Sequence, residues 1–597
     1  MRTTLGAWAL GFSGVVLTTV VLAQEPIPIS APAEAPPPRD VHLLDDVPNY
    51  AQILQDQWRA GVPADVSRAE DSSEYYGRLV DVGKTQGLSL NDCIALALKN
   101  NTNLQIQRLN PVAATAGVRR AWSQFDPRAV GYVNRFRNVS PATTALTAGP
   151  TSLEQLTTFF TSELDANAGL RKTLLSGGAL SFDFNNRRIV TNPSIATPIT
   201  PEYITTLGLS LNQPLLRDFG WRYALLVVEI AQNTEQVAYH QYEASISNTI
   251  AQVEAAYWNF VLAIEAVQVQ EQSLALAQEL QRQNEGKFNV GALPQTAVLE
   301  AKSQVASREA TLIQARNLAV IARDNLRALI NSPAPDKNSL ALIMIEPTDR
   351  PGVPDYPIDL ERSLRTALEQ RPELTAARLN VHGAGLQRKV AENQLLPRLN
   401  FAGGVGVNGL SGTDNSKLVS STTLPVLVSQ DLSGSYTRSI ELMPDGRFYN
   451  WSAGATLEIP IDNAQAKADY AKANIDFEQS SLSLRDLQER VTLEIKTAVS
   501  NLQSDLKSID ATRIARELAE ENLRNQKARY DVGLATTKDL LDYQDQLTQA
   551  RFREINALTR YNTDLAEMRR VEGSLLSARN VLIERVTPEK APWWATF

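Results

Sequence analysis

The sequence predicts a mixed fold in which one unit, made of β-strands and a long helical hairpin, occurs twice along the chain. Three observations support this prediction: an internal repeat, β-rich runs bounded by prolines, and heptad seams in long stretches without proline. The chain has 597 residues, of which 43% are hydrophobic and 21% charged, a composition typical of folded proteins. Its length allows several ordinary domains, and the repeat divides most of it into two.

The repeat appears when the sequence is compared with itself. At an offset of 270 residues, the segment 88–98 aligns with the segment 358–368. Segments further along align at the same or smaller offsets, namely Pro127 with Pro397, Leu211–Pro214 with Leu457–Pro460, and Lys287–Gly291 with Arg529–Gly533. Because the offset shrinks along the chain, we expect the second copy to be shorter than the first.

The repeat and the ends of the chain give the expected domain boundaries. The first residues are typical of a secretory signal, because Arg2 is followed by the apolar stretch Leu5–Val21 and by small residues that suit cleavage after Ala23. Residue 24 is Gln24 rather than cysteine, so we expect no lipid anchor. The expected order is a signal peptide at 1–23, a proline-rich tether at 24–87, the first repeat at 88–330, a linker at 331–357, the second repeat at 358–576 and a tail at 577–597.

Each copy is expected to begin with two helices and to continue with strands. Pro127 and Pro397 should end the helices, because proline cannot continue a helix and restricts the residue before it. A β-rich pair within 164–188 has no counterpart in the second copy, so it is an additional strand pair. Pro214 and Pro460 should close the strands, and both sit where a helix could start. The expected strands lie near 129–137, 164–173, 179–188 and 203–211 in the first copy and near 400–408 and 450–459 in the second.

A long helical arm follows the strands in both copies. Apolar residues spaced by 4, 3, 4 and 3 begin at Val253, and the same spacing recurs from Ile495. Such a seam is typical of coiled-coil packing. As a straight helix, the arm Ala224–Phe288 would be roughly 100 Å long. Gly291 and Gly533 then supply the positive φ that the turn of a helical hairpin needs.

The return helix of the first copy has its own seam. Apolar residues recur every seven positions, and a second apolar series, the companion series, has the same spacing. The first series is Val298, Val305, Leu312, Ala319 and Leu326, and the companions are Ala315, Ala322 and Leu329.

The composition argues against several classes of function. The net charge of −8 is unfavourable for a nucleic-acid partner, whose phosphates attract basic surfaces. Cys93 is the only cysteine, so no disulfide can form within the chain, and His42, His240 and His382 lie far apart in sequence. The sequence has no HExxH, GxSxG or CxxC motif. We therefore expect neither an enzyme nor a bound cofactor or metal.

The hydrophobic pattern also bears on membrane crossing. After the leader, no uninterrupted apolar run approaches the roughly 20 residues that a membrane helix needs. If the exported chain spans a membrane, it must do so with strands, and their edges must be closed.

The segment at each hairpin turn resembles a known family. Arg529-Tyr-Asp-Val-Gly-Leu-Ala-Thr-Thr-Lys-Asp-Leu-Leu-Asp542 is similar to the pattern [KR]-[YF]-x-x-G-x-x-[ST]-x-x-D-[VL]-L-[DE] of the TolC-type outer-membrane efflux proteins. Lys287–Glu300 is the paired version, and the Leu-Asn-Gln-Pro-Leu-Leu run at 211–216 resembles the strand-to-helix passage of the family. The resemblance covers about Leu88 to Ser574, in the correct order and in both halves.

The resemblance implies a homotrimer whose strands close a twelve-stranded β-barrel in the outer membrane, continued in the periplasm by a tunnel of coiled-coil helices. The additional strand pair at Leu164–Arg188 would then lengthen an outer loop or decorate the barrel. Such a channel serves efflux or type I secretion, and a periplasmic adaptor and an inner-membrane pump of the RND, ABC or MFS type open it. We therefore predict a transport channel in the cell outer membrane, in contact with its lipid. The alternative is a structural periplasmic coiled-coil protein without a pore, which would not need paired strands.

The resemblance also implies site residues. Asp539 and Asp542, three residues apart on one helical face, match carboxylates that ring the periplasmic entrance, where six in a trimer would attract cations. Tyr530 matches an aromatic latch residue, but the expected partners fall at Ala297 and Ala535, so packing is its favoured role and a latch the alternative. The tips at 290–294 and 532–535 carry the apolar residues expected to meet the adaptor, which are Val290, Gly291, Ala292, Leu293, Val532, Gly533 and Leu534.

Overall fold

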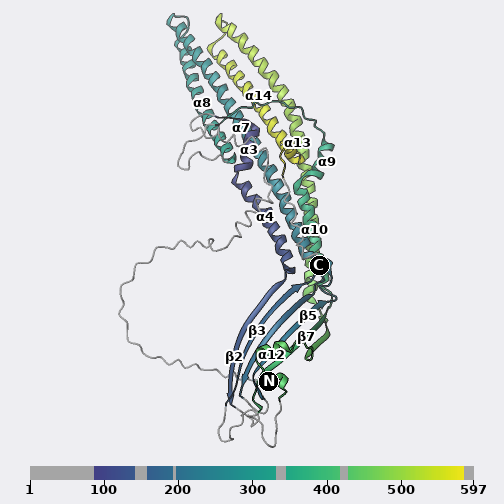
Figure 1. Cartoon of the computed structure of the whole chain (residues 1–597). Coiled ribbons are helices and arrows are strands. Elements are labelled where there is room, and N and C mark those ends of the chain that lie inside the picture. Colours follow the sequence, from purple (N-terminus) through teal and green to yellow (C-terminus); the bar gives the residue numbers. More distant parts are fainter. Residues whose placement is uncertain (1–85, 142–157, 193–196, 331–344, 417–427, 584–597) are drawn as a thin grey trace, which may run out of the picture. The chain divides into compact units, whose positions relative to one another are not determined.

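The computed structural model describes residues 86–141, 158–192, 197–330, 345–416 and 428–583 (Figure 1). The chain divides into two compact units, and the second of them, Pro63–Phe597, contains all of these residues. The expected signal peptide, nearly all of the expected tether and most of the expected tail lie outside the described residues.

The first copy begins with two helices, as predicted. A capping box formed by Ser89 and Asp92 starts the first helix, and the Asn101 side chain caps the second. The elements of this copy are α3 (Leu90–Asn100), α4 (Thr102–Trp122), η1 (Ser123–Phe125), β2 (Arg128–Pro141), β3 (Thr158–Thr173), β4 (Ala179–Thr191), β5 (Ile199–Pro214), α6 (Trp221–Ala224), α7 (Leu226–Asn289) and α8 (Gln295–Ile330).

The second copy follows the same order with fewer strands. Its elements are α9 (Leu360–Gln370), α10 (Pro372–Asn393), β7 (Arg398–Asp414), η2 (Gln430–Leu432), α12 (Tyr436–Glu441), β8 (Tyr449–Glu458), α13 (Ala464–Asp531), α14 (Thr537–Glu572) and α15 (Leu575–Ala578). Before each copy a short strand is found, β1 (Gln86–Leu88) and β6 (Ile345–Pro347), and the two pair in parallel. Residues from the expected tether and the expected linker therefore meet in one small sheet.

The prolines that close the strands do not start the helices. Pro214 is the last residue of β5 and still faces Asn400 in the sheet, and α6 begins several residues later. Likewise, α13 begins several residues after Pro460. The prediction of helix starts at these prolines is wrong because the chain must first turn from sheet to helix, which it does through positive φ angles at Gly220 and Asn463.

The larger sheet has six antiparallel strands in the order β2-β3-β4-β5-β7-β8. The two copies join where β5 pairs with β7. The twelve-stranded trimer expected from the resemblance has four strands per chain, whereas the described residues place six strands in one sheet. The additional pair, β3 and β4, is inserted between β2 and β5 as part of the sheet itself (Figure 1).

The two faces of this sheet differ in polarity, because neighbouring side chains along a strand point to opposite faces. Residues paired across five neighbouring strands form an apolar row on one face. The members of this row are between 42% and 70% exposed, and they are Leu170, Phe182, Leu209, Val405 and Trp451. Partners on the opposite face form a mainly polar row of Tyr132, Asn167, Asn185, Thr206 and Asn408. An exposed apolar face of this extent is typical of a surface that contacts lipid or another protein.

The helices form the two predicted hairpins, α7–α8 and α13–α14, which lie side by side (Figure 1). The predicted seams are confirmed: Val253 and Tyr257 are fully buried in a core that includes α3, and Ile495 and Leu502 are fully buried in a core that includes the equivalent helix α9. None of the helices in the described segments is long and apolar enough to serve as a membrane span.

Candidate functional site

The turns at the ends of the two hairpins have the same backbone geometry. Gly291 has a φ of +78° and Gly533 a φ of +77°. In both turns the amide of the next residue donates to the carbonyl five residues earlier, at 2.8 Å. This is the hydrogen bond that closes a helix ending with a left-handed glycine. The prediction that these glycines adopt positive φ is confirmed.

Apolar side chains are exposed at both tips. Val290 is 79% exposed, and Val532 and Leu534 are each 70% exposed. Gly291, Ala292 and Gly533 are exposed as well, and Leu293 is half-buried. The two tips therefore present apolar side chains to solvent, as a surface that contacts another protein would.

The two predicted carboxylates lie at the start of α14, and both are exposed. Asp539 Oδ2 accepts hydrogen bonds from the Thr536 amide at 3.0 Å and from Thr536 Oγ1 at 2.8 Å, while Thr536 Oγ1 accepts one from the Asp539 amide. This capping box lowers the pKa of Asp539, chiefly through the backbone hydrogen bond. Asp539 is thus held in place and ionised. The Thr-x-x-Asp pattern, which the sequence analysis did not use, signals this cap.

A buried amide connects all four helices just behind the tips. The Asn284 side chain of α7 is fully buried and donates to the carbonyl of Ala297 in α8 at 3.2 Å and to Thr537 Oγ1 in α14 at 3.1 Å. Its Oδ1 accepts the hydroxyl of Tyr530 in α13. Lys287 Nζ lies 4.2 Å from the centre of the Tyr530 ring.

Tyr530 is buried in a small core with Leu280, Leu540 and Leu541. It therefore packs at the tip and also donates a hydrogen bond to Asn284 Oδ1, which the turn motif does not predict. Ala297, where an acidic partner was expected, contributes only its carbonyl oxygen to this cluster. Asn284 gave no signal in the sequence because it lies outside the turn motif.

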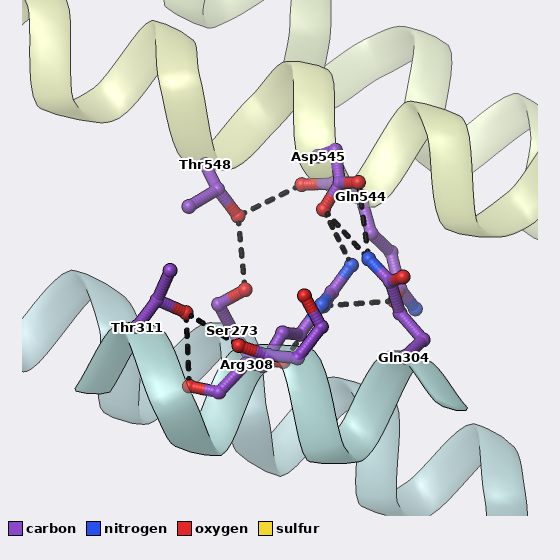
Figure 2. Close-up of polar contacts among 8 residues, drawn as sticks. Ser273, Gln304, Arg308, Thr311, Gln544, Asp545 and Thr548 are labelled. Carbon is purple, nitrogen blue, oxygen red and sulfur yellow. Dashed lines mark hydrogen bonds and ion pairs between the residues drawn. The ribbon is translucent and has the colours of Figure 1, made fainter. Parts of the chain in front are cut away.

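A second polar cluster joins the hairpins further from the tips (Figure 2). The Arg308 side chain of α8 is 4% exposed, and its Nη2 donates to Asp545 Oδ1 of α14 at 2.7 Å. Its Nη1 donates to the Ser273 carbonyl of α7 at 2.8 Å and to Gln544 Oε1 of α14 at 3.3 Å. Gln304 Nε2 also donates to Asp545, at 3.1 Å. Burial lowers the pKa of Arg308, and the charge of Asp545 opposes this change.

Arg308 occupies a seam position. It lies one heptad before Ala315 in the companion series, and the buried Ala301 precedes it by another heptad. Small alanines leave room for a long side chain between helices. A charged residue in a heptad series of alanines is the sequence signal that could have identified it.

A sheet with one apolar and one polar face, joined to two long helical hairpins with exposed apolar tips, is an architecture typical of outer-membrane channel proteins. The model of the outer membrane efflux protein family matches residues 190–332 and 363–574, which together make up more than half of the chain. The chain belongs to this family, and its place is the outer membrane.

Named relatives agree with this assignment. The chain is 26% identical to the outer membrane protein TolC of Escherichia coli over 364 residues, which cover 60% of this chain and 66% of that protein, slightly under two thirds of its length. It is 24% identical to the outer membrane efflux protein BepC of Brucella suis over 363 residues, covering 60% of this chain and 70% of that one.

Solved structures share the fold. The Campylobacter jejuni CmeC outer membrane channel has a TM-score of 0.55 at 17% identity, with 81% of this chain and 86% of that one covered. The Neisseria gonorrhoeae MtrE outer membrane channel, crystallised in its open state, has a TM-score of 0.55 at 18% identity, with 81% and 89% covered. The predicted combination of strands with long coiled-coil hairpins is confirmed.

Proposed function

We propose that this chain is one of three identical subunits of a trans-periplasmic exit duct for efflux or type I secretion. The observation that supports this most directly is the two-faced sheet. Its apolar face suits contact with outer-membrane lipid, and its polar face suits a water-filled lumen. The family assignment supports a channel rather than an enzyme.

The edge strands of the larger sheet need to pair with strands of further copies of the chain. Within the described residues, β2 and β8 form the two edges of the larger sheet. Strand edges cannot remain unpaired in lipid, because nothing there replaces the missing hydrogen bonds. A six-stranded sheet with a lipid-facing side must therefore close with other copies, β2 of one pairing with β8 of the next.

The tips suit a partner in the periplasm. Two exposed apolar turns, at Val290–Leu293 and Val532–Leu534, offer a surface for an adaptor protein, which would connect the duct to an inner-membrane pump. Asp539 and Asp542 of three chains would form a ring of carboxylates at the entrance. In this proposal the ring concentrates cations and resists anions.

A measurement of assembly and conductance tests the proposal. Protein purified in mild detergent should have the mass of three chains, and after reconstitution into a planar bilayer it should produce discrete conductance steps. A chain that stays monomeric and produces no steps would favour the alternative of a structural coiled-coil protein. Copurification from native membranes would identify the adaptor and the pump class.

A further inference from the structure

The hairpin β3–β4 distinguishes the first copy from the second. Four strands continue directly into the helical part of the chain: β2 follows α4, β5 leads to α7, β7 follows α10 and β8 leads to α13. The β3–β4 hairpin instead turns back at 174–178, close to the segment after β5, where the Gly220 amide donates to the Ser176 carbonyl at 3.0 Å. No equivalent hairpin is found among the described residues of the second copy.

This hairpin is paired along its whole length. β3 pairs with β2 along the whole length of β2, from the pair Arg128 and Arg171 at one end to the pair Pro141 and Thr158 at the other. β4 pairs with β3 through thirteen consecutive residue pairs, and it pairs with β5 from Ala179 onward without a register shift. The hairpin is therefore a structural part of the sheet, in register with the strands on either side.

The hairpin also continues the polarity of the two faces. Leu170 of β3 and Phe182 of β4 stand opposite each other in the apolar row, and Phe182 stands opposite Leu209 of β5. Asn167 and Asn185 stand opposite each other in the polar row. A hairpin that only decorated the outside in water would have no need of this alternation.

We propose that β3 and β4 form part of the membrane wall, so that the three copies close a barrel of eighteen strands. This inference rests on the proposed function, since it assumes three chains around one lumen. Barrel diameter grows with strand number, so eighteen strands instead of twelve widen the barrel from roughly 24 Å to roughly 36 Å between backbones, at about 4.8 Å per strand and a tilt of about 40°. The outer-membrane end then passes bulkier cargo than a twelve-stranded barrel.

Cysteine accessibility tests this placement. Cys93 is buried and is the only cysteine, so Cys93→Ser gives a background for single introduced cysteines. The test positions are Leu170→Cys and Phe182→Cys on the apolar face and Asn185→Cys on the polar face. The matched controls are Leu209→Cys and Ser210→Cys on β5, which lies in the sheet in either case. The full-length trimer in lipid vesicles is treated with a charged maleimide.

We expect Leu170→Cys and Phe182→Cys to react about tenfold more slowly than Asn185→Cys, because lipid excludes a charged reagent. The contrast between Leu209→Cys and Ser210→Cys should be the same. Fast reaction at both Leu170→Cys and Phe182→Cys, with Leu209→Cys protected, would overturn the inference and leave the proposed function standing. Fast reaction at Leu209→Cys as well would overturn both.

A deletion gives a second, independent measurement. Removing 158–191 takes out β3, its turn and β4 and leaves β2 antiparallel to β5, as β7 is to β8. The largest polyethylene glycol that enters the channel from the outer side should be smaller for the deletion variant than for the full chain. An assembled deletion variant with an unchanged size limit would contradict the inference.

Discussion

The two helical hairpins have the same backbone but different polar side chains. Their seams are buried at equivalent positions, and their tip glycines have φ angles within a degree of each other. The residues that connect the hairpins, however, differ between the copies. The first hairpin supplies Asn284 and Arg308, and the second supplies Tyr530, Thr537 and Asp545.

The backbone of the hairpins and the polar contacts between them depend on different kinds of residue. Glycine turns and apolar seams determine the backbone, and they are present in both copies. The polar cross-links form once per chain, between unlike residues, so the repeat does not reveal them. The largest effects of mutation should therefore come from the residues that form these polar cross-links.

The largest effect is expected for Asp545→Ala. It leaves the buried Arg308 guanidinium without its counter-charge, which should cost about 2 kcal/mol of local stability because Asp545 itself is half-exposed. Hydrogen exchange of the α8 and α14 amides measures this local opening. The matched control is Glu271→Ala, which breaks an exposed pair with Arg316 of the same 2.7 Å length and should cost less than about 0.5 kcal/mol. Equal effects of the two substitutions would contradict a role of burial.

Tyr530→Phe should have the next largest effect. It removes the donor to Asn284 Oδ1 and leaves a buried acceptor unpaired, at a cost of about 1 to 2 kcal/mol. The equivalent residue in the first copy is Phe288, which is exposed. Phe288→Tyr should leave exchange at the tips unchanged. If Tyr530→Phe also left amide exchange at the tips unchanged, the Asn284 cluster would not hold the hairpins together.

Gly291→Ala and Gly533→Ala should have equal effects of about 1 kcal/mol each. A Cβ at either position meets no atom within 4 Å, so the cost comes only from the left-handed backbone. Exchange of amides in the last turn of α7 and of α13 measures the two costs separately. A clear difference between them would show that the two turns are not equivalent.

A pH-dependent effect is expected at a pair of acids that only the second copy has. Asp505 of α13 is buried, and the equivalent position in α7 is Ala263. Burial raises the pKa of Asp505 from 3.8 to about 6, with a further contribution from Asp564 of α14. Arg560, 3.3 Å from Asp505, offsets part of the cost of ionisation.

The sign of the pH dependence follows from this raised pKa. Between about pH 4 and pH 6 the folded state holds a proton that the unfolded state releases, so the packing of α13 on α14 loses stability as the pH rises through this range. Asp505→Asn should therefore raise the melting temperature at pH 7.5 and leave it nearly unchanged at pH 4. A gain of the same size at both values would contradict the raised pKa.

Much of the fold could be predicted from the sequence. The repeat, both seams and both tip turns follow from spacing and from glycine, and the order of the elements is confirmed. The four strands per chain implied by the resemblance differ from the six found in the sheet. The additional pair, β3 and β4, has no counterpart in the second copy, and sequence alone does not say whether such a pair enters the sheet.

The candidate site was less accessible to sequence reasoning. The turn motif identified the tip residues, Tyr530 and the two aspartates by position. Asn284 and Arg308 were missed because their partners in the second hairpin lie more than 200 residues away, and only packing brings them together. The role of Asp539 and Asp542 at an entrance stays a prediction.

One measurement tests the central claim, which is that three chains form a duct whose entrance is lined by Asp539 and Asp542. A trivalent cation is added on the periplasmic side of single reconstituted channels, for the wild type, for Asp539→Ala with Asp542→Ala, and for the control Asp510→Ala, an exposed acid of α13 away from the tip. We expect the cation to block the wild type and the control, because it neutralises several carboxylates at once, and to block the double variant much more weakly. Equal block of all three channels would contradict this expectation and would show that the two aspartates form only a solvated helix face.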